Sequence, residues 1–108
     1  MKKGDIILVK YPFTDFSAGK FRPALVILTE DEEGDFILAF ITSMNVNKNV
    51  FDIPLSKNGT GLHKDSILRL KKIMTIHKSL IAGKIGNVSK DTLKIIDKKL
   101  LEMLKPKN

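Results

Sequence analysis

Cysteine and tryptophan are both missing from this chain of 108 residues. Without cysteine there is no disulfide framework, no thiolate metal site and no thiolate nucleophile. No apolar run approaches the ~18 residues that a membrane-spanning helix needs, and the N-terminal residues lack the long apolar segment of a signal peptide. We therefore expect a soluble protein of the cytoplasm that has no membrane partner.

Histidine is scarce as well, since only His63 and His77 occur. Histidine pairs are a common acid–base device in catalysis. Here one histidine lies in a glycine-rich turn and the other at the end of a predicted strand, and their spacing does not pair them. No carboxylate pair or cluster of metal-ligand residues occurs at a recognisable spacing either. The sequence predicts two surface histidines, no metal site and no cofactor.

The composition is ordinary for a globular protein, with 43% hydrophobic and 29% charged residues. A chain of this length can bury a core of its own, so we expect a single domain over residues 1–108. The net charge of +7 divides into −2 for residues 1–54 and +9 for residues 55–108. A basic half favours a polyanion or an acidic protein segment as partner, whereas a lysine-rich helix that only confers solubility is the alternative.

The centre of the predicted fold is the stretch of residues 20–29, in which Arg22 and Pro23 precede a continuous apolar run. Pro23 fixes its own φ and pushes the preceding residue into an extended conformation. A run without polar alternation is typical of a strand buried on both faces. Arg22 is therefore expected at the mouth of this strand. There its guanidinium either points at a phosphate or serves as a plain solubilising cap.

Five to seven short strands are predicted, and six candidates lie over residues 6–10, 24–29, 36–42, 51–55, 66–76 and 81–88. Residues 30–35 hold five carboxylates. We interpret them as a charged hairpin turn rather than a cation site, because Gly34 lies between two apolar runs. In the long strand over residues 66–76, the positions expected to face inward are Leu68, Leu70, Ile73 and Ile76.

A change of period at Ser89 predicts the start of a helix. Ser89 is a good N-cap, and Asp91 falls in the first turn, where a negative charge favours the helix dipole. Apolar residues then recur at spacings of three and four, at Leu93, Ile96, Leu100, Met103 and Leu104. This pattern predicts an amphipathic helix that packs on the barrel formed by the strands and ends before Pro106.

Four short motifs occur in a fixed order: Gly4-Asp5-Ile6, Arg22-Pro23-Ala24-Leu25-Val26, Ile41-Thr42-Ser43 and Asp65-Ser66-Ile67-Leu68-Arg69. In this combination the chain resembles the MazF/PemK family of toxin ribonucleases, from near its first residue to its C-terminal helix. The resemblance implies a mainly β fold, a small SH3-like barrel of the CcdB/MazF type with a C-terminal amphipathic α-helix.

The same resemblance implies an activity and partners. The activity would be that of a metal-independent, sequence-specific endoribonuclease (mRNA interferase). It would cleave single-stranded RNA, leave a 2′,3′-cyclic phosphate and need no cofactor. The protein would be the toxin of a type II toxin–antitoxin system, a homodimer inhibited by a cognate acidic antitoxin and able to bind DNA together with it.

Site residues follow from the matched motifs. Arg22 matches the catalytic arginine of the family and Thr42 its catalytic threonine. Because a guanidinium hardly deprotonates, Arg22 is better suited to clamping the phosphorane oxygens than to accepting a proton. A second set of residues is expected to contact RNA, namely Thr14, Asp15, Lys20, Ser43, Asn45, Arg69 and Lys71. At the position of Lys71 many relatives carry an acidic residue.

Two alternatives remain open from the sequence. One is a non-catalytic protein of the same fold that binds a protein target, as the gyrase-poisoning CcdB relatives do. Those relatives use a C-terminal tryptophan motif, which this chain lacks. The other is a basic SH3-like module that binds nucleic acid without cutting it.

Overall fold

The structure is a computed structural model that describes residues 1–10, 21–44 and 48–106. Its strands are β1 (Asp5–Lys10), β2 (Phe21–Leu28), β3 (Asp35–Ser43), β4 (Asp52–Leu55), β5 (Ser66–His77) and β6 (Ile81–Asn87). Two helical segments follow β5 and β6, the short 3-10 helix η1 (Lys78–Leu80) and the α-helix α1 (Lys90–Leu104).

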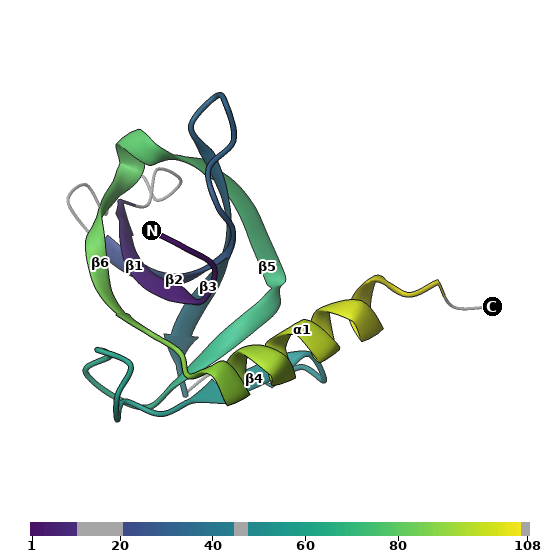
Figure 1. Ribbon diagram of the computed structural model, residues 1–108. Coiled ribbons are helices and arrows are strands. Elements are labelled where there is room, and N and C mark those ends of the chain that lie inside the picture. The colour runs from purple at the N-terminus through teal and green to yellow at the C-terminus, as the bar shows by residue number, and fades with distance from the viewer. Residues whose placement is uncertain (11–20, 45–47, 107–108) are drawn as a thin grey trace.

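The strands form one curled antiparallel sheet in the spatial order β4-β5-β3-β2-β1-β6. Figure 1 shows this sheet bending into a ring, with α1 at one end of the ring and projecting beyond it. The predicted mainly β architecture with a C-terminal helix is confirmed. Strand pairing does not close the ring, because β4 and β6 are the edge strands in the described part of the chain.

Alternate residues of the inner strands supply two cores on opposite faces of the sheet. Ala24 and Val26 of β2 join one apolar cluster, and Leu25 between them joins the other, which α1 covers through Ile96. All three β2 residues are fully buried, as the absence of polar alternation predicted. The prediction is wrong for Leu28, which is 58% exposed because it lies at the hairpin end, beyond a register shift.

Arg22 does not stand at the mouth of a strand, as the sequence suggested, but inside β2, where it pairs with Val9. The strand begins three residues earlier than predicted because pairing with β1 continues through Pro23 to Phe21. Pairing of β2 with β3 stops at Ala24, opposite Phe40. Pro23, the next residue, has no N–H to offer a neighbouring strand.

An irregularity bends β5 and reverses one predicted orientation. Neighbouring residues Ala39 and Phe40 pair with Ile73 and Arg69, so that residues 70–72 of β5 lie between the two partners. Such an insertion bends the strand and shifts the alternation of its side chains. Leu68, Leu70 and Ile76 are buried as predicted, whereas Ile73 is 36% exposed and was predicted wrongly. The insertion also turns Lys71 and Lys72 toward solvent.

The acidic stretch forms the turn of the β2–β3 hairpin, as predicted. Asp31 Oδ1 accepts hydrogen bonds from the backbone N–H groups of Glu33 at 2.9 Å and Asp35 at 3.0 Å. The hydrogen bonds from Asp35 and Glu33 hold the pKa of the Asp31 carboxyl below its usual value. Gly34 takes a φ of 84°, which an L side chain rarely adopts.

Helix α1 begins as the sequence indicated, with the Ser89 side chain accepting a hydrogen bond from the Thr92 N–H at 3.1 Å. Ile96 is fully buried, and Leu93, Leu100 and Met103 pack against the same core. Leu104 was expected on the packed face but is 72% exposed, because the last turn projects past the sheet (Figure 1). Among the helices of the described residues, none is long and apolar enough to cross a membrane.

Candidate active site

Arg22 and Thr42 come from neighbouring strands and meet at one place. The last paired residues of β2 and β3 are Ala24 and Phe40. Arg22 lies two residues before Ala24 and Thr42 two residues after Phe40, so both lie just beyond the same end of the pairing. Because side chains alternate along a strand, Arg22 and Thr42 lie on the same face as that pair. Both residues line two separate hollows in the surface. The structure therefore brings the sequence-predicted pair together.

The first hollow, which we call the basic groove, has a volume of about 430 Å³. It is lined by Arg22, Phe40, Ile41, Thr42, Arg69, Lys71, Lys72, Ile73 and Met74. Four of these residues are cations, and among the described residues no carboxylate lines the groove. A concave surface with this charge suits a bound anion such as a phosphodiester.

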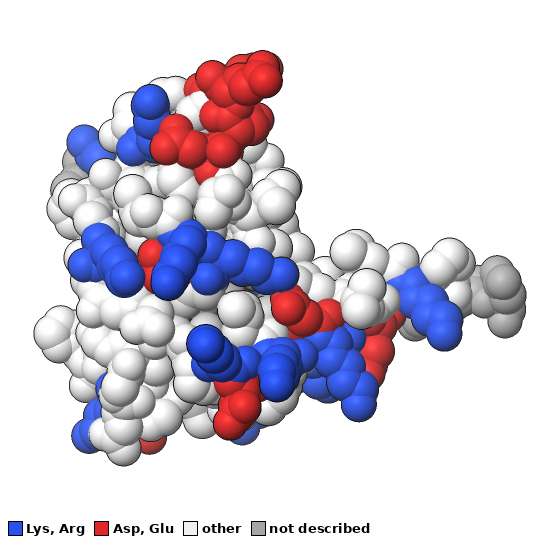
Figure 2. Space-filling model, viewed as in Figure 1, with Lys and Arg blue, Asp and Glu red and all other residues white. Residues whose placement is uncertain are grey.

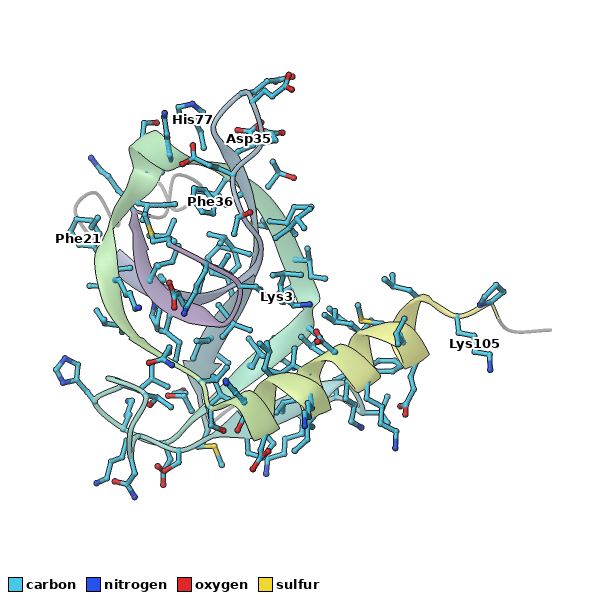
Figure 3. The ribbon with its side chains drawn as sticks, in the orientation of Figure 1. Lys3, Phe21, Asp35, Phe36, His77 and Lys105 are labelled. Atoms are coloured by element: carbon cyan, nitrogen blue, oxygen red, sulfur yellow. The ribbon has the colours of Figure 1, made fainter. Side chains whose placement is uncertain are left out.

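The second hollow shares Arg22, Ile41 and Thr42 with the basic groove and has a volume of about 580 Å³. The residues that line it include Leu62, Ile85 and the aromatic residue Phe21. The described part of its lining is again without a carboxylate. Phe21 is 48% exposed, and Figure 3 shows it at the outer margin of the curled sheet. This hollow is therefore more apolar than the basic groove.

Arg69 reaches the basic groove from β5 with a carboxylate bound to its guanidinium. Its Nε donates to Asp52 Oδ1 at 3.4 Å, and its Nη2 lies 3.2 Å from Asp52 Oδ2. The Asp52 side chain is 5% exposed and also accepts from the backbone N–H of Asn49 at 2.7 Å. Asp52, on β4, thereby restricts the direction in which Arg69 points.

A sequence model of PemK-like, MazF-like toxins of type II toxin–antitoxin systems matches residues 2–104. The chain belongs to this family. It shares the fold of solved MazF structures at low sequence identity. A comparison with curated protein sequences gives no match.

Three solved structures illustrate this similarity. One is described as an endoribonuclease in complex with its cognate antitoxin from Mycobacterial species, with 14% identity over 100% of this chain and 99% of that one, at a TM-score of 0.76. The Mycobacterium tuberculosis toxin MazF-mt6 is 18% identical over 91% of this chain and 93% of that one, at a TM-score of 0.73. A MazE–MazF structure from Deinococcus radiodurans is 17% identical over 99% of this chain and 97% of that one, at a TM-score of 0.76.

The other predicted contact residues of this MazF-like chain fall into two groups. Lys71 and Arg69 line the basic groove, and Ser43 lines the second hollow. Thr14, Asp15, Lys20 and Asn45 lie outside the described residues. All of these RNA contacts stay predictions, as do the catalytic roles of Arg22 and Thr42.

Sequence reasoning missed two residues at this site. His63 is exposed, as expected of a surface histidine, but it lines the second hollow together with Arg22. Asp52 was missed because it is far from Arg69 in the sequence, although a carboxylate at the start of a short apolar strand is a weak signal. His77 instead caps η1, where its Nδ1 accepts from the Ser79 N–H at 3.1 Å.

Charge is separated along the molecule. Figure 2 shows Lys and Arg side chains in a band across the middle of the viewed face and over α1, with Asp and Glu side chains gathered at the tip of the β2–β3 hairpin. Within the described ranges, no group of three or more His, Asp or Glu side chains is arranged to hold a metal ion. Metal independence stays a prediction.

Proposed function

We propose that this chain is a metal-independent, sequence-specific endoribonuclease that cleaves single-stranded RNA as the toxin of a type II toxin–antitoxin system. The observation that carries the proposal is the convergence of Arg22 and Thr42 between two hollows whose described linings hold no carboxylate. A phosphodiester at that point would meet a guanidinium fork and a hydroxyl without facing a negative side chain.

In the proposed reaction, the 2′-oxygen of the RNA attacks the adjacent phosphorus and the bond from phosphorus to the 5′-oxygen breaks. The products are a 2′,3′-cyclic phosphate and a 5′-hydroxyl, so the 2′-hydroxyl loses one proton and the departing oxygen gains one. Arg22 keeps its own proton and clamps the phosphorane oxygens, while the Thr42 hydroxyl donates to the same charge. Arg69 adds a second cation from the basic groove.

The proposal extends to the assembly and its partners. We place the protein in the cytoplasm as one domain over residues 1–108, which forms a homodimer and binds a cognate acidic antitoxin, with DNA as a ligand of that complex. One of the similar structures is described as an endoribonuclease in complex with its cognate antitoxin, and another as a MazE–MazF structure. Leu101 and Leu104 are exposed on α1 and offer apolar surface to a second copy.

The test is cleavage of a long RNA of mixed sequence by the purified protein in EDTA, read by mapping the new ends. We expect cuts at a defined sequence that leave 2′,3′-cyclic phosphate. Arg22→Ala should lower the rate by about 10²–10³-fold, the usual loss for one charge-stabilising donor. Arg22→Lys should restore little, because a point charge does not replace the fork.

Lys94→Ala, at an exposed position of α1, serves as the control and should cleave like the wild type. Activity that disappears on chelation and returns with Mg²⁺ would contradict the metal-independent mechanism. Wild-type rates in Arg22→Ala would remove Arg22 from the site. RNA that is bound but never cut would favour the non-catalytic nucleic-acid module.

A further inference from the structure

The two hollows meet at Arg22 and Thr42, which line both of them. In the proposed function, these two residues hold the scissile phosphate. An RNA strand continues in both directions from any internal phosphate. A phosphate held at the residues shared by the two hollows therefore has both hollows next to it for the neighbouring nucleotides.

The two hollows differ in the chemistry that they offer to the strand. The basic groove adds Arg69, Lys71 and Lys72 to the shared arginine, which suits the negative backbone. The second hollow replaces most of this charge with Phe21, Leu62 and Ile85. Its polar groups include Lys64 and the hydroxyl of Ser43. An apolar wall with a few polar groups suits a nucleobase, which is a flat ring with hydrogen-bonding groups at its edge.

We propose that the second hollow binds one nucleobase next to the scissile phosphate, stacked on Phe21, and that this base contact contributes to the sequence preference. The inference rests on the proposed ribonuclease function. Proteins that bind single-stranded RNA stack its bases on aromatic side chains, and the ring of Phe21 is half exposed beside Arg22. The volume of about 580 Å³ is that of an ordinary small-ligand site.

The part of the wall that contains Leu62 is held firmly, so this part of the hollow exists before RNA binds. Leu62 is carried by the loop of residues 56–65, whose Gly61 packs against the backbone of Ile85 too closely for any side chain. Inside this loop, Thr60 Oγ1 donates to the Ser56 carbonyl at 2.6 Å and accepts from the Leu62 N–H at 3.3 Å. A preformed site loses little ordering entropy on binding and discriminates better between bases.

The experiment maps cleavage ends in an RNA pool of random sequence for the wild type, Phe21→Ala and Phe21→Tyr. We expect Phe21→Ala to lower kcat/KM by about 5- to 150-fold, the range for loss of one stacked base. The base preference should relax at one nucleotide flanking the cut and persist elsewhere. Phe21→Tyr keeps a stacking ring and should retain both the rate and the preference.

Leu28→Ala is the matched control, because Leu28 is an exposed apolar residue of the same strand that lines neither hollow. It should cut like the wild type, and thermal unfolding of each variant checks the fold. An unchanged preference in Phe21→Ala, whether its rate is normal or uniformly reduced, would overturn the inference. So would a defect confined to inhibition by an antitoxin peptide.

Failure of the underlying function would look different. An inactive wild-type protein would overturn the ribonuclease assignment, and this inference with it. A wild type that cleaves, loses activity in Arg22→Ala and keeps its base preference in Phe21→Ala would retain the function and remove only the base-binding hollow.

Discussion

At the scale of single residues, the contact between Asp52 and Arg69 has the most direct consequence for the site. Asp52 is almost fully buried, and it binds both the Arg69 side chain and the backbone N–H of Asn49. It joins β4, β5 and the segment before β4 at the margin of the basic groove. Its carboxylate thus reaches Arg69 from another strand.

We predict that Asp52→Asn lowers RNA cleavage by about tenfold, within the range of coupling for residues in direct contact. The reason is that Arg69 loses a buried partner that helps to set its direction. In an Arg69→Gln background, Asp52→Asn should lower kcat/KM very little, because the arginine that Asp52 orients is already absent. Measuring kcat/KM for the wild type, both single variants and the double variant gives the coupling.

Asp97→Asn is the matched control, since Asp97 forms a surface ion pair with Lys3 at 2.8 Å and lines neither hollow. It should leave cleavage unchanged. If the losses in the Asp52→Asn and Arg69→Gln variants were additive in the double variant, Asp52 would not act through Arg69.

At the scale of elements, the loop of residues 56–65 and strand β6 are joined by a contact between two glycine backbones. A side chain at Gly86 would collide with the Thr60 carbonyl, and one at Gly61 with the Ile85 carbonyl. Gly61 also has a φ of 82°, which favours glycine for conformational reasons alone. This contact holds the loop that carries Leu62 and Lys64 against the second hollow.

Gly86→Ala should therefore destabilise the protein by about 1–3 kcal/mol or more, because the added methyl group forces two backbones apart. Gly83→Ala, on the same strand, meets nothing within 4 Å and should stay within about 0.5 kcal/mol of the wild type. Urea unfolding followed by circular dichroism measures both. Equal stability of the two variants would mean that the loop does not pack on β6 as described.

At the scale of the whole molecule, positive charge dominates, with a net charge of +7. The described acidic residues include a group at the hairpin tip, away from the basic band seen in Figure 2. Lys71 and Lys72 lie in the basic groove, whereas Lys94 and Lys98 lie exposed on α1. An acidic antitoxin segment can thus be attracted either by the charge of the groove or by the charge of the molecule as a whole.

We predict that the charge of the basic groove, and not the net charge of the molecule, determines how tightly the acidic segment binds. The double variant Lys71→Glu with Lys72→Glu should bind the proposed acidic antitoxin segment, tested as a synthetic peptide, about tenfold or more weakly, since close charge contacts affect binding strongly. The variant Lys94→Glu with Lys98→Glu makes the same change in net charge, from +7 to +3, and should bind nearly as well as the wild type. Titrations across a salt series measure both, with binding of the wild type weakening as salt rises.

If both double variants bound the peptide equally weakly, the net charge of the molecule, and not the charge of the groove, would attract the peptide. The peptide should also compete with RNA for the groove. A tightly bound peptide that leaves RNA cleavage untouched would place the two ligands on separate surfaces.

The sequence by itself determined those features that depend on neighbours along the chain. Ser89 predicted the start of α1, because an N-cap bonds to a residue three positions away. The acidic stretch before Asp35 predicted a hairpin turn. The continuous apolar run without polar alternation predicted the burial of residues 24–26. The motifs around Arg22 and Thr42 predicted both the family and the pair of residues between the two hollows.

The tertiary structure decided what depends on contacts between distant segments. Ile73 faces solvent because the register between β3 and β5 shifts, and no local pattern encodes a register. Leu104 is exposed because α1 is longer than the surface that it covers. The partner of Arg69 is on β4, seventeen residues away, and the second hollow is assembled from strands and a loop that meet only in the folded chain. Side-chain spacing specifies which face of an element is apolar, but which elements that face meets is set by the packing of the whole chain.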